Sequence, residues 1–119
     1  MDFNKYRFTY NAMAFFNAQE RYPEGVAQEV FKDGKEGLDA LCWALEELST
    51  QGDIVRRSLG YDKGEILTAE VAKAQLKPND IPKAKLLILD ALKRGMGEAH
   101  EEEEVDLVLM ELQKKTKNG

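Results

Sequence analysis

The segment around Trp43 constrains the fold most, because its apolar residues predict a helix with two apolar sides. Within residues 37–49, one helical face carries a stripe at three- and four-residue spacing: Leu38, Leu41, Cys42, Leu45 and Leu48. At about 100° per residue, Trp43 points away from that stripe, beside Ala40 and Ala44. A surface helix is polar on its outer side. The segment is therefore either sandwiched in the core or covered on its second side by another surface.

Start and stop signals in the rest of the chain predict an all-α fold, a compact bundle of about five to six helices. Asn11 or Thr9 caps the first helix, Thr68 caps a later one, and Pro82 suits a first helical turn. Gly52 is interpreted as the stop of the Trp43 helix, and Asp53 as the cap of a short turn after it. Similarly, the glycines at 95 and 97 are interpreted as ending the next long helix, with a hinge there. The expected helices cover about residues 12–22, 26–31, 35–50, 68–76, 80–95 and 98–119.

A chain of 119 residues has the length of one domain, and we expect a single helical domain over residues 1–119. Residues 1–10 alternate aromatic and polar side chains, which favours a short extended N-terminal arm. This arm packs either on its own domain or on a neighbouring copy. Residues 98–119 begin with glutamates and end with lysines, which complements a helix dipole and predicts a charged C-terminal helix. Residues 61–64 are expected to form a turn or an exposed loop.

Charge and composition exclude several function classes. A net charge of −5 argues against binding to nucleic acid, because phosphate backbones attract an excess of Lys and Arg. One cysteine allows no internal disulfide, and this agrees with a reducing compartment. The chain contains no apolar run long enough for a membrane span and no secretory leader at its start. We therefore expect a cytoplasmic protein that is neither secreted nor bound to a membrane.

The residues that usually carry catalysis are sparse, and we expect no enzyme activity, no cofactor and no metal. His100 is the single histidine and lies in an acidic run, where a solvated face is favoured over a metal site. Cys42 lies on the leucine stripe, which favours a buried thiol over a nucleophile. No phosphate-binding glycine loop, nucleophile elbow or Cys-x-x-Cys pair occurs. The run Glu101–Glu104 is either a solvated helix start or an acidic face for a basic partner.

A surplus of apolar residues away from the helical stripes is the better indication of function. A domain of this size can sandwich about one helix, and three helices carry apolar residues on their second side. Exposed apolar patches on globular domains mark association sites, in which aromatic residues and Met are favoured. We therefore expect self-association, a partner protein, or both. The candidate partner-binding residues are Trp43, Leu86, Leu89, Leu107, Met110, Phe15 and Phe16.

The order of these segments resembles the tail assembly chaperones of long-tailed bacteriophages and gene-transfer particles. The resemblance covers residues 7–95 and consists of an ordered set of motifs. These are Arg7-Phe-Thr-Tyr-Asn-Ala-Met-Ala-Phe-Phe16, Leu38-Asp-Ala-Leu-Cys-Trp-Ala-Leu45, Leu67-Thr-Ala-Glu-Val71 and the Leu-rich helix Lys85–Arg94. Two segments depart from the family's pattern: residues 51–66 are longer than the loop expected there, and the acidic C-terminal helix has no counterpart.

The resemblance implies a non-enzymatic chaperone of virion assembly in the host bacterial cytoplasm, encoded by a phage or prophage. Such proteins bind the long, helical tape measure protein before the tail tube polymerises around it. Many of them also occur as a longer form made by ribosomal frameshifting. The implied partners are the tape measure protein or another helical client, together with further copies of this chain. The alternative hypothesis is a small acidic helical adaptor or regulatory subunit that docks on one folded partner.

Overall fold

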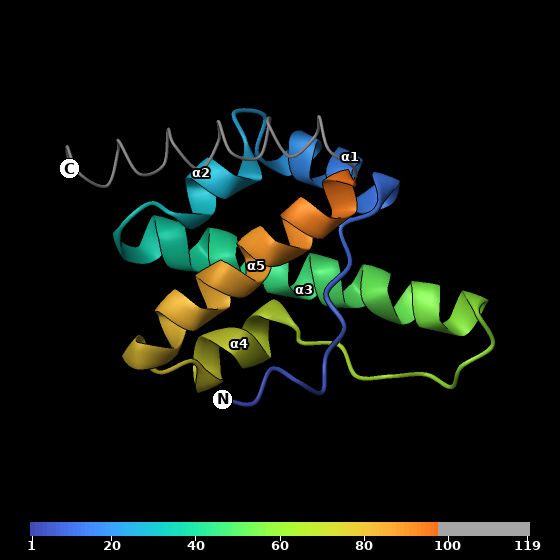
Figure 1. The fold of residues 1–119 in the computed structure, drawn as a ribbon. Coiled ribbons are helices and arrows are strands. Elements are labelled where there is room, and N and C mark those ends of the chain that lie inside the picture. The colour runs from blue at the N-terminus through green and yellow to red at the C-terminus, as the bar shows by residue number, and fades with distance from the viewer. Residues whose placement is uncertain (98–119) are drawn as a thin grey trace.

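The computed structural model describes residues 1–97, and this part of the chain is all-α with no strand (Figure 1). The predicted fold class, a compact helical bundle, is confirmed. The charged helix predicted for residues 98–119 lies outside the described residues. The elements are α1 (Ala12–Arg21), α2 (Val26–Val30), α3 (Gly34–Ser58), α4 (Ala69–Gln75), the one-turn 3₁₀ helix η1 (Pro78–Asp80) and α5 (Ile81–Met96).

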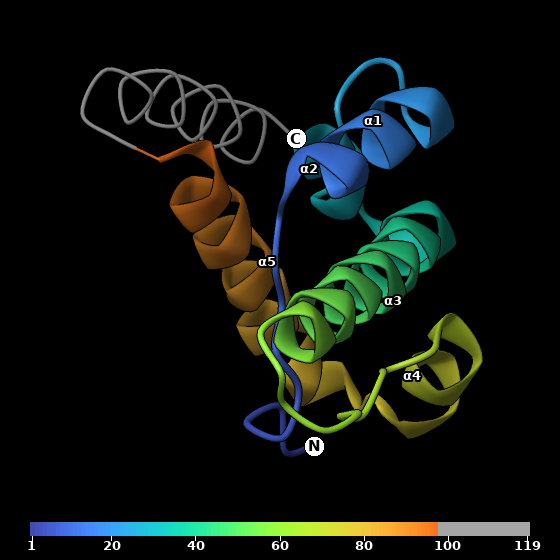
Figure 2. The same cartoon turned by 90° about the vertical axis from the view of Figure 1, so that its right-hand side faces the viewer.

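The central element is α3, which contacts α1, α2, α4 and α5 (Figures 1 and 2). It buries Leu41, Leu45 and Leu48 on the predicted stripe, and also Ala40 and Ala44 on the opposite side. A helix buried around most of its circumference is a core helix. The sandwiched arrangement therefore accounts for the two apolar sides of this segment.

Two helix starts lie where the sequence predicts them. The Asn11 side-chain oxygen accepts a hydrogen bond from the Ala14 N–H at 2.9 Å, and the Thr68 hydroxyl accepts one from the Val71 N–H at 3.2 Å. Each satisfies a backbone donor that the first helical turn leaves without a partner. Local side-chain chemistry thus sets where α1 and α4 begin.

The interpretation of Gly52 as a helix stop is wrong, because α3 continues through it to Ser58. A Cβ atom at position 52 would lie 1.8 Å from the Arg7 carbonyl oxygen, so glycine is needed for the N-terminal arm to approach the helix. Gly95 plays the same role in α5, where a Cβ atom would lie 2.1 Å from the Tyr10 carbonyl oxygen. The arm therefore crosses α3 at Gly52 and α5 at Gly95. Helix α5 continues through Gly95 and ends at Met96, just before Gly97.

The N-terminal arm packs on its own domain, between α3 and α5 (Figure 2). Its Phe3 and Phe8 side chains are only 3% and 6% exposed. The Thr9 N–H donates to the Leu48 carbonyl oxygen at 3.0 Å, and the Arg94 guanidinium donates to the Phe8 carbonyl oxygen at 3.4 Å. These contacts join the start of the chain to its two longest helices.

The prediction that Asp53 caps a short turn is wrong. Asp53 lies inside α3, and its carboxylate is buried. Its Oδ1 atom accepts a hydrogen bond from the Gly64 N–H at 2.6 Å. The Ser49 hydroxyl accepts another from the Leu67 N–H at 3.0 Å. The loop between α3 and α4 is therefore fastened to α3 by buried polar side chains.

Candidate functional site

Three of the eight large apolar side chains that are exposed in the described residues belong to α1. This helix buries only its small residues Ala14 and Ala18, at 1% and 5% exposure. Its largest apolar side chains point outward: Met13 is 58% exposed, Phe15 44% and Phe16 62%. Phe16 lies opposite the two buried alanines, and Met13 and Phe15 lie on either side of it; we call these three residues together the α1 aromatic face. Because alanines allow close packing on the core, the helix can present its bulky residues to the outside.

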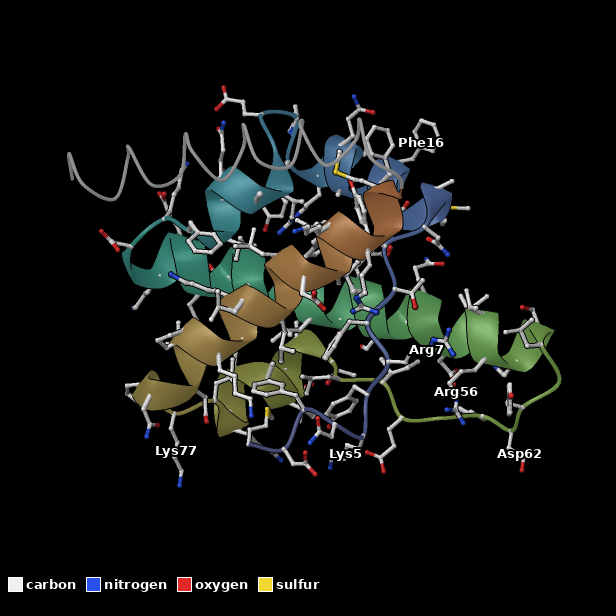
Figure 3. All side chains as sticks on the ribbon, in the orientation of Figure 1. Lys5, Arg7, Phe16, Arg56, Asp62 and Lys77 are labelled. Carbon is white, nitrogen blue, oxygen red and sulfur yellow. The ribbon has the colours of Figure 1, made fainter. Side chains whose placement is uncertain are left out.

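The aromatic rings of this face contact one another. Phe15 and Phe16 pack edge to face with centroids 5.2 Å apart, and the Tyr10 ring lies 6.3 Å from that of Phe15. Burial raises the pKa of the Tyr10 hydroxyl, which keeps this group neutral. Phe16 projects away from the body of the molecule (Figure 3). Rings held against each other lose little conformational freedom on binding, so they form a prearranged contact surface.

Trp43 is not part of this exposed surface. It is half-buried against the core, and its ring packs edge to face with that of Tyr22 at a centroid distance of 5.5 Å. Tyr22 is the C-cap residue that directly follows α1. The second apolar side of α3 thus packs within the chain at Trp43.

The other sequence candidates have different positions. Leu86 in α5 is 64% exposed, whereas Leu89 is half-buried and packs against the core. Leu107 and Met110 lie outside the described residues. The structure therefore brings Phe15 and Phe16 together, leaves Leu86 exposed on another helix, and places Leu89 against the core with Trp43.

Sequence reasoning missed Met13, although it lies one helical turn from Phe16 and next to Ala14. The signal that could have found it is the alternation of small and large apolar residues in α1, since only the small ones fit against the core. A polar hollow lined by Lys5, Arg7 and Arg56 was also missed. Its parts come from separate segments, so no local motif indicates it.

The described residues contain little chemistry for catalysis. Burial raises the pKa of the Cys42 thiol, which disfavours the reactive thiolate. Among residues 1–97, no group of three His, Cys, Asp or Glu side chains could hold a metal ion. Within the same residues, no helix combines the length and apolarity needed to cross a bilayer. His100 and the Glu101–Glu104 run lie outside the described part of the chain.

Comparisons with protein-family models, with curated proteins and with solved structures found no match to this chain.

Proposed function

We propose that this chain is a non-enzymatic binding protein, an assembly chaperone that holds the tape measure protein of a phage or prophage tail. The observation that carries the proposal is the α1 aromatic face. A ten-residue helix that buries two alanines and exposes Met13, Phe15 and Phe16 is poorly explained by folding alone. The resemblance of the ordered motifs to tail assembly chaperones supports the tape measure protein as the client.

The chemistry of the face favours a helical, apolar client. Met13 and Phe15 lie on opposite flanks of Phe16, so one partner helix covers Phe16 and one of these two residues. Covering two large apolar side chains that are about half exposed contributes about 1.5–3 kcal/mol. Aromatic residues and Met are enriched at such interfaces because they supply area and adapt to a partner's shape. At 1.5 Å per residue, α1 is about 15 Å long, which matches about three turns of a partner helix. A long client with a repeating apolar stripe offers many such segments.

The same face supports self-association as a second part of the proposal. Two copies could each cover the other's aromatic rings in a symmetric contact, and a client helix would compete with that contact. In the oligomer, a second copy of the chain covers the aromatic rings. In the complex with the client, the client helix covers them instead. The negative net charge opposes uncontrolled association between copies.

Coexpression with the client tests the proposal. The proposal predicts that a long, helix-rich polypeptide is encoded near the gene for this chain, and we expect that polypeptide to stay in the supernatant only when the chain is present. Phe16→Ser should abolish this effect, and Leu59→Ser is the matched control. Phe16 is 62% exposed on α1, and Leu59 is 63% exposed at the end of α3. Circular dichroism should show that both variants keep the helical content of the original chain.

Two results would count against the proposal. If Phe16→Ser protects the client as well as the original chain does, the α1 aromatic face is not the binding surface. If the chain forms a complex of fixed stoichiometry with one folded partner and protects no apolar polypeptide from aggregation, the adaptor hypothesis is favoured instead.

A further inference from the structure

A polar hollow of about 270 Å³ lies where the N-terminal arm, the last turns of α3 and the loop after α3 meet. Figure 3 shows Arg7 of the arm and Arg56 of α3 close together on this side of the molecule. The volume is near the lower end for small-molecule sites, which begin at roughly 300 Å³. The hollow therefore has room for an ion or a small molecule.

Both carboxylates that line the hollow already have counter-charges. The Asp53 Oδ1 atom accepts from the Gly64 N–H at 2.6 Å, and its Oδ2 atom lies 3.2 Å from Arg57 Nε. Glu65 lies 3.5 Å from Lys5 Nζ in an exposed pair at the rim. Attraction to Glu65 raises the pKa of Lys5, so this lysine stays charged. The acidic groups thus leave little uncompensated negative charge in the hollow.

Two arginines that line the hollow have no such partner. Among residues 1–97, neither Arg7 nor Arg56 has a carboxylate oxygen within 4.0 Å. The Arg56 guanidinium lies 5.7 Å from the centre of the Tyr61 ring. The Arg56 Nε atom is buried and has no hydrogen-bond acceptor in the described part of the chain. A buried donor is rarely left without an acceptor in folded proteins, so the Arg56 Nε–H is available to a water molecule or to a bound anion.

A second buried atom narrows the chemistry of that group. Asp53 Oδ2 is also buried without a hydrogen bond, although Arg57 offsets its charge. A group that satisfies both atoms accepts a hydrogen bond from Arg56 and donates one to Asp53, which a water molecule or a protonated anion can do. A singly protonated phosphate, inorganic or as a monoester, has acceptor oxygens and an O–H donor. An ionised carboxylate has acceptors only.

We propose that this hollow is a binding site for a phosphate group, held between Arg7 and Arg56 with its hydroxyl donated to Asp53. Guanidinium groups bind phosphate oxygens in paired hydrogen bonds, and two unpaired arginines supply the opposite charge. The site comprises the arm, α3 and the loop after it, so it does not depend on the α1 aromatic face.

Titration of the full chain with sodium phosphate tests the site, with sodium chloride added to keep the ionic strength constant. In nuclear magnetic resonance spectra, the Arg56 Nε–H signal and the Lys5 and Gly64 amide signals should shift and saturate. Arg7→Gln should raise the dissociation constant about tenfold, which corresponds to losing one charged hydrogen bond. Acetate should bind more weakly than phosphate.

The matched control is Arg21→Gln. Arg21 lies on α1, and its guanidinium is 5.7 Å from the Tyr22 ring, the same distance as between Arg56 and Tyr61. The control should bind phosphate like the original chain. Arg7 is exposed, so its substitution leaves the core intact and the test does not depend on a variant of Arg56. Shifts that do not saturate, equal losses in both variants, or equal affinity for acetate would overturn the proposal.

Discussion

Replacing Gly52 with alanine tests whether the N-terminal arm rests directly on α3. In a helix, alanine is favoured over glycine by about 1 kcal/mol, so a glycine that only weakens the helix would gain stability on substitution. In this structure the added Cβ atom would lie 1.8 Å from the Arg7 carbonyl oxygen and 2.7 Å from the carbonyl carbon. Both are backbone atoms, and the arm must move away.

The cost of that movement follows from the arm's contacts. Loss of the 3.0 Å hydrogen bond from the Thr9 N–H to the Leu48 carbonyl costs about 1 kcal/mol. Exposing the buried Phe8 ring costs about 1.5–3 kcal/mol. After subtracting the helix propensity gained, we expect Gly52→Ala to lower the free energy of unfolding by about 2 kcal/mol. Urea unfolding followed by circular dichroism should show the midpoint fall by about 1 M.

Ile54 supplies the matched control, because it lies two residues further along the same helix and is 44% exposed. There, Ile54→Ala should be more stable than Ile54→Gly by about 1 kcal/mol. The preference between glycine and alanine should therefore reverse between positions 52 and 54. If alanine is preferred at both positions, the arm does not lie against α3 at Gly52.

Three further predictions concern single side chains. Trp43→Ala should lower the free energy of unfolding by about 3 kcal/mol, because it removes packing and the ring contact with Tyr22. Phe16→Ala should change the free energy of unfolding by less than about 0.5 kcal/mol. Equal effects of the two variants in urea unfolding would contradict the placement of Trp43. The Lys77 N–H and then the Met1 amino group hold the pKa of Asp80 below its ordinary value. Because the pKa is lowered in the folded state, the ionised carboxylate stabilises the fold above about pH 4, and this contribution is lost as the pH falls further. The stability difference between the original chain and Asp80→Asn should therefore shrink below that pH. A difference that is constant with pH would refute this. Cys42 is fully buried with a raised pKa, so a thiol reagent should label it only as fast as the protein unfolds, and rapid labelling of the folded protein would contradict this.

The sequence predicted those parts of the fold that depend on neighbouring residues. Asn11 and Thr68 cap helices because their side chains reach backbone donors three residues away. The apolar stripe of α3 was predicted because its period is that of the helix itself. The extension of α3 beyond Gly52 could not be predicted, since a glycine in a helix indicates a stop unless a distant segment crosses it.

The candidate site was predicted only where it depends on residues that are close together in the sequence. Phe15 and Phe16 could be named as partner-binding residues from their type, and both are exposed. The assignment of Trp43 required knowing that Tyr22 packs on it, which is a contact between helices. The polar hollow depends on three segments meeting around Arg56, and composition alone does not reveal such a meeting.

The arm also determines the order in which this chain can complete its structure during synthesis. Its first residues leave the ribosome first, yet the Phe8 carbonyl oxygen bonds Arg94, 86 residues later in the chain. The arm therefore cannot reach its final place until α5 has been translated, and contacts this distant in sequence form slowly. Until then, the arm lacks the contacts that α5 supplies. The nascent chain thus carries an aromatic segment that is only partly packed for most of its synthesis.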